Sequence, residues 1–440
     1  MHDDGDEAAV DAILGHLWRD DTPWQVLTDL CEIESRLAGH PGEARAAERI
    51  ADAFETAGLA DVTHDTSPIT RWTRGHTTFE ITDPVERSFE AVALPYSPAG
   101  DHRGRLVDVG YGTPEEIAET DVEDAIVVAS TNTPADQRFV HRMEKYGHAV
   151  DAGAAAFVFA NHKPGQLPPT GSLRFDEEGA IPGVGVSYET GEWLREYAER
   201  DGEVRLAVDA TTDDGETHVV HGTVGPDTDD EILVLAHFDA HDVGEGAFDN
   251  GCGIAVVCGV ASALAELDHD CRVRIAGVGG EEVGLLGSEA LAETLDTDRI
   301  RAVINVDGAG RHRDLLAYTH THEGVTEVAD ALADETGHPV HVEPDPHPWS
   351  DHWPFLREGV PALQLHSKSA ERGRGVTHTR ADTRDKADSR TLRSHAMLTA
   401  LLVRMLERRN LSRLDRSDLL DALVEQDFEP GMRAAGVWPQ

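Results

Sequence analysis

Lysine is nearly absent from this chain of 440 residues. Only Lys145, Lys163, Lys368 and Lys386 occur among 38 basic residues, whereas 83 residues are acidic and the formal net charge is −45. The acidic residues are spread along the chain, and no acidic tail accounts for the imbalance. Nucleic-acid binding needs clustered cations that contact phosphates, so the composition argues against a nucleic-acid partner.

Cysteine and long apolar runs are also scarce. The four cysteines, at positions 31, 252, 258 and 271, form no CxxC pair, which argues against a thiolate zinc finger and predicts small buried hydrophobic side chains. No run approaches the roughly 18 consecutive apolar residues that a membrane span needs. The first residues lack the basic and apolar regions of a secretory signal. We therefore expect no membrane partner and a cytoplasmic location.

The chain is long for a single hydrophobic core, and its pattern predicts more than one domain. Residues 1–95 combine helices expected over 8–60 with short β-like runs over 62–95. Residues 96–215 form a separate module of short apolar strands, two helices and Pro/Gly-rich loops. Residues 216–440 show the clearest α/β alternation and end in a helical appendage. Continuous apolar strands expected at 232–236, 273–278, 302–306 and 361–365 predict an α/β fold with a largely parallel sheet covered by helices.

Three of these strands end in residues suited to metal binding. His237 follows the first strand, Glu281 and Glu282 follow the second, and Asp307 follows the third. Sites in open α/β sheets form outside the carboxyl ends of the strands, so these side chains should converge. Taken singly, each has a structural alternative: Asp307 could cap a helix, and a Glu-Glu pair is usually a solvated helix start.

Two further residues complete a set that suits two metal ions. Asp249 lies in a glycine-flanked turn, and His378 lies in the segment 377–383. Two cations about 3.5–4 Å apart can activate a water molecule and polarise a carbonyl group. Zinc accepts imidazole nitrogen and carboxylate oxygen. The sequence therefore predicts a hydrolytic two-metal site.

Seven segments, in this order, resemble the M28 zinc aminopeptidases. They are residues 35–42, 237–239, 246–251, 280–284, 305–307, 350–352 and 378–383. The resemblance covers the chain from about residue 25 to residue 408. It implies a zinc-exopeptidase-like fold, a peptide substrate and two zinc ions, with cobalt or manganese as possible substitutes.

The resemblance also implies a role for each ligand. Asp249 would bridge the two metals through a turn with a cis Asp249–Asn250 peptide bond. His237 and Asp307 would complete one metal, and Glu282 and His378 the other.

Residues around the ligands receive roles in the same way. Glu281 would be the general base and acid, and Asp239 would hold the ring of His237, as carboxylates commonly do behind a metal-bound histidine. Asp351 and His352 would lie beside the substrate or support the site; the alternative is a turn before a helix. Thr377 stands where many family members have a tyrosine whose hydroxyl can stabilise the oxyanion. Either another group donates here, or the substrate class differs.

Two wider resemblances concern the module and the surface. Residues 96–215 resemble the smaller, β-rich protease-associated domain that is inserted in many family members, which would shape the site rather than do chemistry. Spread acidic residues with so little lysine resemble the proteins of salt-loving archaea, whose surfaces repel themselves at low ionic strength. An ordinary acidic protein is the alternative.

Four functions remain open from the sequence. An aminopeptidase needs acidic groups to hold a free ammonium, whereas a glutamate-carboxypeptidase-like enzyme needs arginines to hold a terminal carboxylate. Arginines at 311, 313, 372 and 374 lie near the motifs. A glutaminyl-cyclase-like acyl transferase is more remote, since residues 350–363 look similar there too. A receptor-like ectodomain that kept the fold usually loses ligands, and here all five and Glu281 are present.

Overall fold

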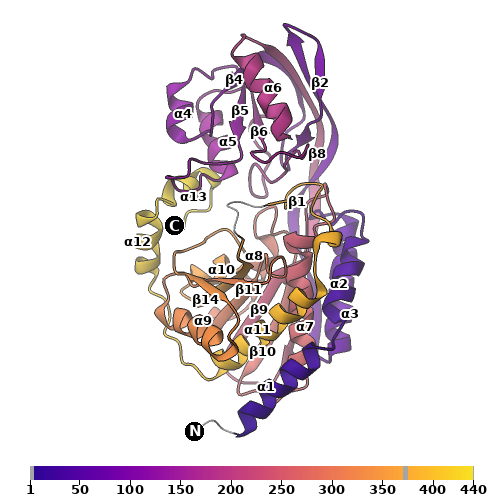
Figure 1. Ribbon diagram of the computed structural model, residues 1–440, viewed down its shortest axis with the longest axis vertical. Helices are drawn as coiled ribbons and strands as arrows, with labels where there is room; N and C mark the ends of the chain where they lie inside the picture. The colour runs from indigo at the N-terminus through magenta and orange to yellow at the C-terminus, as the bar shows by residue number, and fades with distance from the viewer. Residues whose placement is uncertain (1–3, 370–374, 440) are drawn as a thin grey trace.

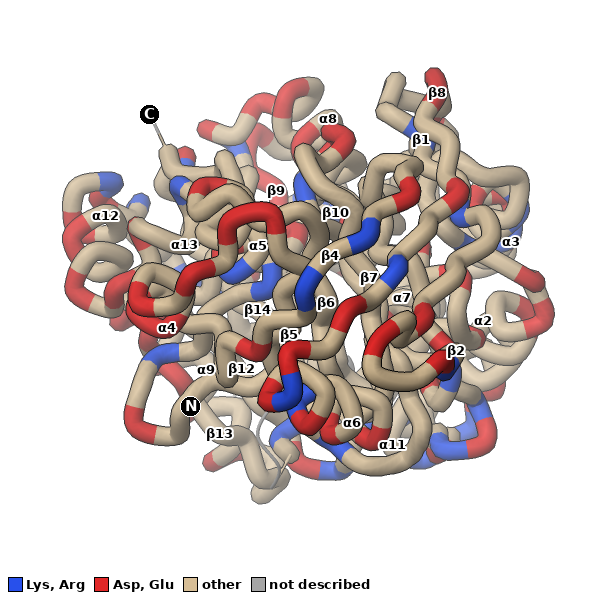
Figure 2. The backbone as a smooth tube through the Cα atoms, turned by 90° about the horizontal axis from the view of Figure 1, so that it is seen from above, with Lys and Arg blue, Asp and Glu red and all other residues tan. Residues whose placement is uncertain are grey.

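A computed structural model describes residues 4–369 and 375–439, which form two bodies stacked along the long axis of the molecule. The larger body lies at the bottom of Figure 1 and a smaller module at the top. Two strands, β1 (Ala60–Asp83) and β8 (Glu203–Val224), run along one side and join them. Acidic positions are scattered over the elements seen in Figure 2 rather than gathered in one patch.

The larger body is built on a mixed, mostly parallel sheet. Its strand order is β13-β12-β14-β11-β9-β10-β8. The members are β9 (Glu231–His237), β10 (Arg272–Val278), β11 (Ile300–Val306), β12 (Leu315–Tyr318), β13 (Val340–Glu343) and β14 (Ala362–Ser367). β10, β9, β11 and β14 pair in parallel, whereas β8 and β12 run antiparallel to their neighbours β10 and β14. All four strands expected here from the sequence are present, so the expected fold is confirmed.

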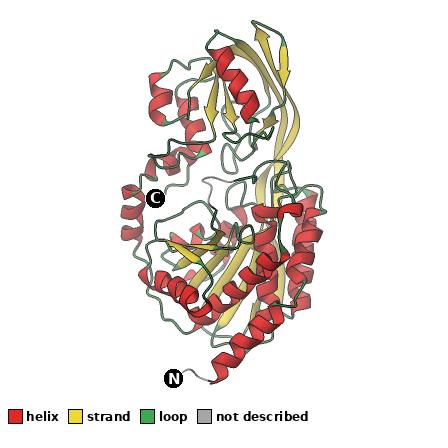
Figure 3. Cartoon of the chain, in the orientation of Figure 1, coloured by secondary structure: helices red, strands yellow, loops and turns green. Residues whose placement is uncertain are grey.

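Helices cover both faces of this sheet (Figure 3). A hydrophobic core lies on each face of the sheet, and alternate residues of β9 pack into different cores: Val234 into one and Leu235 into the other. The first core contains α1 (Asp4–Leu17), α2 (Thr22–Cys31), α3 (Pro41–Ala57), α7 (Cys252–Leu264), α9 (Glu323–Thr336) and α11 (Ser389–Glu407). The second contains α8 (Leu286–Thr294), α10 (Trp353–Leu356), α12 (Arg416–Glu425) and α13 (Glu429–Ala435). Burial on both faces explains the continuous apolar runs of the central strands.

The smaller module lies wholly between β1 and β8 in the chain. Its parallel strands are β4 (Gly100–Asp108), β5 (Ile126–Ser130), β6 (Ala156–Ala160) and β7 (Gly183–Val186), with β3 (Val92–Ala93) antiparallel at the edge. Helices α4 (Pro114–Glu119), α5 (Arg142–Asp151) and α6 (Tyr188–Ala198) flank them. At the opposite side from β1 and β8, α13 lies against α5 (Figure 1). Arg138 donates to Glu144 and to Asp427 there, and so ties the C-terminal segment to the module.

The expectation of short β-runs over 62–95 is confirmed for residues 87–93 and is wrong for the residues before them. β1 is continuous over 24 residues and pairs with β8 along nearly its whole length, with register shifts near residues 60–63, 74–77 and 81–83. β2 (Arg87–Phe89) and β3 are short. Polar residues such as those at 63–67 lie on an exposed part of β1, where backbone pairing rather than a buried face maintains the strand.

One segment, residues 247–264, is long and apolar enough to span a membrane by composition, but it lies in the core of the larger body. All four cysteines are free thiols. Cys252, Cys258 and Cys271 are buried as expected, whereas Cys31 is half-buried.

Candidate metal centre

The ends of three adjacent strands deliver most of the expected ligands. β11, β9 and β10 are neighbours in the sheet, and they run parallel, so their carboxyl ends share one edge. His237 is the last residue of β9 and pairs with Val278, the last residue of β10. Glu281 and Glu282 follow β10 after two glycines, and Asp307 follows β11 directly. The convergence predicted from the sequence is present.

One group of ligand atoms belongs to His237, Glu281 and Asp307, whose donor atoms all lie within 4.8 Å of one another. His237 Nε2 lies 3.8 Å from Asp307 Oδ1. Asp307 is held from its other oxygen, because Ser350 Oγ donates to Oδ2 at 2.7 Å and Gln364 Nε2 donates to it at 3.2 Å.

A second group belongs to His241, Glu282 and His378, whose donor atoms meet the same 4.8 Å limit. His378 Nε2 lies 3.1 Å from Glu282 Oε2, and His241 Nε2 lies 3.0 Å from the same oxygen. The other nitrogen of His378, Nδ1, lies 3.2 Å from the carbonyl oxygen of Thr170, a residue of the smaller module. This contact leaves Nε2 directed at the second group.

Asp249 lies between the two groups. Its Oδ1 is 3.7 Å from His237 Nε2, and its Oδ2 is 3.3 Å from His378 Nε2. The Asp249–Asn250 peptide bond is cis, as the resemblance implied. Asp382 accepts hydrogen bonds from the amides of Phe248 and Asp249, at 2.7 and 3.1 Å, and so fixes the turn that carries this carboxylate.

Asp239 organises the strand ends. Its carboxylate accepts from the amides of Glu281 and Glu282, at 3.1 and 3.2 Å, and lies 3.3 Å from His237 Nδ1. One buried carboxylate therefore orients the imidazole of His237 and the backbone of both glutamates.

The carboxyl groups of the site are of two kinds, one with a raised pKa and one with a lowered pKa. Burial raises the pKa of Glu281 well above the ordinary value of a glutamate, and the negative charges of Glu282 and Asp307 add to this against the attraction of His237. Burial also tends to raise the pKa of Asp249 and Glu282. This effect is outweighed by Arg311 beside Asp249 and by His241 beside Glu282, which hold the pKa of each carboxyl well below its usual range. Burial likewise opposes ionisation of Asp307, yet contact with His237 lowers its pKa to about 2. Glu281 is thus the carboxyl of this set that is disposed to carry a proton.

Asp351 and His352 lie behind the first group. Ser288 Oγ donates to Asp351 Oδ1 at 2.6 Å, and burial raises the pKa of Asp351 to about 7. His352 stacks on His320 with ring centroids 4.3 Å apart, and its Nδ1 lies 3.3 Å from Asn305 Nδ2. The side chains of Asp351 and His352 are fully buried, and the two residues form the turn that directly precedes α10, which was the alternative interpretation.

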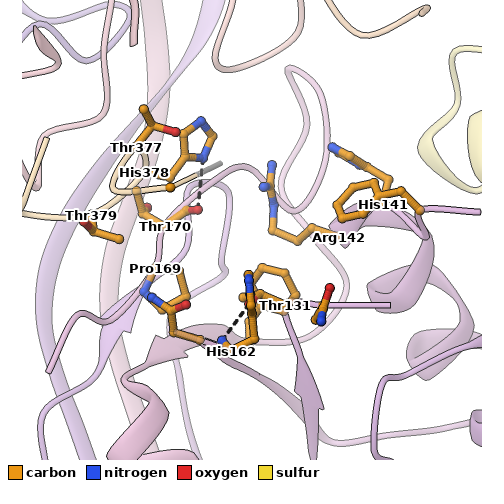
Figure 4. A pocket seen from close by; sticks show the side chains of 14 residues that line it. Thr131, His141, Arg142, His162, Pro169, Thr170, Thr377, His378 and Thr379 are labelled. Carbon is orange, nitrogen blue, oxygen red and sulfur yellow. Dashed lines mark hydrogen bonds between the residues drawn. The ribbon is translucent and has the colours of Figure 1, made fainter. Parts of the chain in front are cut away.

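A cleft opens beside His378, between the two bodies (Figure 4). Thr377, His378 and Thr379 line it from the larger body, and the module supplies residues that include Phe139, His141, Arg142, Phe159 and Thr170. Thr377, which stands where many M28 aminopeptidases have a tyrosine, therefore lines this cleft. In Figure 4 the dashed bond from His378 to Thr170 crosses from one body to the other.

Sequence reasoning missed three contributors to the site. His241 follows His237 by four residues, a spacing that was a usable signal. Asp382 lies in the segment 378–383 that carries part of the resemblance, but it was given no role. Thr170 had no such signal, because its contact with His378 joins positions about 210 residues apart. Arg311 was considered for substrate binding, but it donates to the carbonyl oxygen of Phe248 at 2.8 Å and lies 3.4 Å from Asp249 Oδ1.

The donor set fits zinc. It combines imidazole nitrogens with carboxylate oxygens, the two ligand types that zinc accepts alongside thiolates. Within the described residues, His237 Nε2 and Glu282 Oε1 are buried without a hydrogen-bond partner, and each belongs to a residue of one of the two groups. Buried polar atoms of this kind are normally satisfied, and metal ligands are one reason for an exception.

Comparison with known proteins agrees with this geometry. Residues 219–403 match the model of peptidase family M28, and residues 97–194 match the PA domain. The chain therefore contains an M28 peptidase domain with an inserted PA domain. It is 30% identical over 229 residues to aminopeptidase YwaD of Bacillus subtilis (strain 168), a match that covers 49% of each chain. It thus spans about half the length of that curated relative.

Solved structures resemble this chain over most of its length. The aminopeptidase from Aneurinibacillus sp. strain AM-1 gives a TM-score of 0.70 at 25% identity, covering 92% of this chain and 97% of that one. BSAP, a zinc aminopeptidase from Bacillus subtilis, shares the fold with a TM-score of 0.70 at 24% identity, covering 90% and 98%. The M28 domain and the inserted PA domain expected from the sequence are both confirmed.

Proposed function

We propose that this protein is a two-zinc aminopeptidase that releases amino acids from the N-terminus of peptides. The observation that carries the proposal is the position of Asp249, whose two carboxylate oxygens face His237 on one side and His378 on the other. A carboxylate so placed can bridge two cations in one hydrolytic site.

The residues would divide the metals as follows. Asp249 would bridge, His237 and Asp307 would hold one zinc, and Glu282 and His378 would hold the other. When bound, zinc supplies Lewis acidity, which lowers the pKa of a water molecule and polarises the substrate carbonyl.

Glu281 is the proposed general base and acid. Its carboxyl group belongs to the His237–Asp307 group, and its raised pKa suits a group that takes a proton from the attacking water and returns it to the leaving amine. The Asp239 contact with the Glu281 amide fixes the backbone from which this side chain extends.

The aminopeptidase assignment is supported by the relatives, since YwaD and the Aneurinibacillus protein are both named aminopeptidases. One observation favours the carboxypeptidase alternative: the buried Arg142 lines the cleft beside His378, and a guanidinium is well suited to bind a terminal carboxylate. Arg372 and Arg374, considered from the sequence for the same role, lie outside the described residues.

A substrate panel in molar salt with added zinc tests the function. We expect hydrolysis of aminoacyl p-nitroanilides and no cleavage of N-blocked peptides. Cleavage of the blocked peptides at their carboxyl end would assign the carboxypeptidase function instead. Cyclisation of an N-terminal glutamine without peptide-bond cleavage would assign the acyl transferase.

Chelation tests the metal requirement. The buried carboxylates and imidazoles lose their common partner when metal is removed, and a ligand that binds only the folded state stabilises it by mass action. We expect chelation to abolish activity and to lower the melting temperature, and zinc to restore both. Full activity after verified removal of metal would contradict the proposal.

A further inference from the structure

His241 has no function among the ligands assigned above, yet it lies in the centre. It follows β9 in the segment that leads to the Asp249 turn, four residues beyond His237. Its side chain is only 3% exposed. The structure therefore excludes this imidazole from solvent and places it against Glu282 and His378.

The spacing of the surrounding donor atoms suits a tetrahedral ion. Zinc bonds of about 2.0–2.1 Å at tetrahedral angles separate neighbouring donor atoms by about 3.3 Å. The distances in this half of the site are 3.0 Å from His241 Nε2 to Glu282 Oε2, 3.1 Å from His378 Nε2 to the same oxygen, and 3.3 Å from His378 Nε2 to Asp249 Oδ2. The two imidazole rings lie edge to face, at 79°, with centroids 4.5 Å apart, and both direct Nε2 at Glu282 Oε2.

The hydrogen bonding of His241 also favours metal binding. Apart from the close approach of Nε2 to Glu282, neither ring nitrogen forms a hydrogen bond of good geometry with residues 4–369 or 375–439. A buried imidazole without partners is unfavourable unless another group satisfies it. The zinc ion that Glu282 and His378 are proposed to bind would satisfy the His241 imidazole.

We propose that His241 is an additional zinc ligand in the Glu282–His378 half of the centre, an inference that rests on the proposed two-zinc function. This half then has four protein ligands: Asp249, Glu282, His378 and His241. The other half has three, namely Asp249, His237 and Asp307. Structural zinc sites are closed by four protein ligands, whereas catalytic sites leave one position open. The two halves are therefore unequal, and the open position belongs to the half that also contains Glu281.

Metal affinity tests this assignment independently of turnover. His241→Phe keeps a planar ring and removes both donor nitrogens. His320→Phe is the matched control, because His320 is equally buried but belongs to neither ligand group. Full-length metal-free proteins are titrated with zinc in competition with a chromophoric chelator. We expect the wild type and His320→Phe to bind two zinc ions with the same affinities. In His241→Phe, one of the two zinc affinities should be weakened by about 10–100-fold.

A cysteine at the same position gives a positive signal. In His241→Cys loaded with cobalt, a thiolate bound to the ion produces a ligand-to-metal charge-transfer band that the cobalt-loaded wild type lacks. We expect this band, because the donor atom at position 241 lies within bonding reach of the ion held by Glu282 and His378. The band also confirms that the variant is folded and loaded.

The possible failures are distinguishable. Unchanged zinc affinities in His241→Phe overturn the inference and leave the two-zinc function intact. A weakened affinity in His241→Phe without a charge-transfer band in cobalt-loaded His241→Cys also overturns it, because the effect is then one of packing. A wild type that binds fewer than two zinc ions contradicts the proposed function itself.

Discussion

Glu281 and Glu282 are neighbours in sequence but belong to different ligand groups. Glu282 contacts two imidazoles, and its pKa lies well below the usual range despite burial, because His241 and His378 favour its charged form. Burial instead raises the pKa of Glu281. Two adjacent residues of one type thus have opposite electrostatic environments, which is the arrangement that separates a ligand from a proton carrier.

The first prediction separates these two roles. Glu281→Gln should lower kcat by about 10²–10⁴-fold, the usual contribution of a general base, and keep both zinc ions. Glu282→Gln should instead lose zinc from one site. Steady-state kinetics and metal analysis of the purified variants check both outcomes. Near-normal turnover in Glu281→Gln would show that another group accepts the proton.

The second prediction concerns Glu43, a fully buried residue of α3. It accepts a hydrogen bond from the amide of Gly39 at 2.6 Å, and burial, with Asp239 nearby, raises its pKa from 4.5 to about 8. Between these two values the folded protein binds a proton that the unfolded chain has lost. This contribution to stability is therefore complete below about pH 4.5 and is lost as the pH rises towards 8, with a slope of up to about 1.4 kcal/mol per pH unit.

Glu43→Gln preserves the shape of the protonated side chain and removes the titration. Melting temperatures of both chelated proteins, measured from pH 5 to pH 8 in molar salt, should fall less steeply with rising pH in the variant. Parallel curves would show that Glu43 does not titrate in this window.

At the scale of elements, the loop of the module that contains Thr170 supports the metal centre. The amide of Thr170 donates to the carbonyl oxygen of His378 at 2.8 Å, and its own carbonyl oxygen lies 3.2 Å from His378 Nδ1. His378 has a positive φ of 58°, so its conformation depends on such contacts. The PA domain therefore positions a proposed ligand in addition to lining the cleft.

The third prediction tests that support. Thr170→Pro removes the amide donor, and the loss of one buried hydrogen bond, about 0.5–1.5 kcal/mol, should weaken zinc binding by up to about tenfold. Thr170→Ala keeps the backbone contacts and is the control. Competition titration with a chelator compares the two variants. Equal affinities would show that His378 is held by its own loop alone.

Sequence patterns predicted the strands of the larger body well, and the residues proposed as ligands lie close together in the structure. β9, β10, β11 and β14 are continuous apolar runs, and the residues that follow the first three are set by the parallel topology. β1 was not predicted as one strand, because its exposed part has no buried face and depends on pairing with β8, about 140 residues away. His241 was not predicted either: its spacing from His237 was a signal, but its contact with Glu282 forms only when the segments after β9 and β10 meet.

At the scale of the whole molecule, the dominant property is charge. Acidic positions occur on both bodies and in both terminal regions, and the net charge of −45 has no compensating basic patch in the view of Figure 2. Charge of one sign at this density disfavours the compact state through repulsion, and salt screens it.

The fourth prediction follows from this charge. The Debye length falls from about 30 Å at 0.01 M salt to about 3 Å at 1 M, so the melting temperature should rise strongly between these concentrations. Calorimetry or circular dichroism in potassium chloride checks it at fixed pH and zinc concentration. A melting temperature that does not change with salt would identify an ordinary acidic protein.

The pairing of β1 with β8 determines how the smaller module could be removed or replaced. The chain leaves the larger body along β1 and returns along β8, and Pro68 lies opposite Glu216 in their antiparallel register. The two ends of the inserted module are therefore adjacent, because they lie on paired antiparallel strands. A two-residue turn could rejoin the ribbon below the module and leave the strand order of the larger body intact. A related module could therefore be grafted through the same two strands. It would bring its own cleft wall, and it would have to reproduce the Thr170 contacts that hold His378.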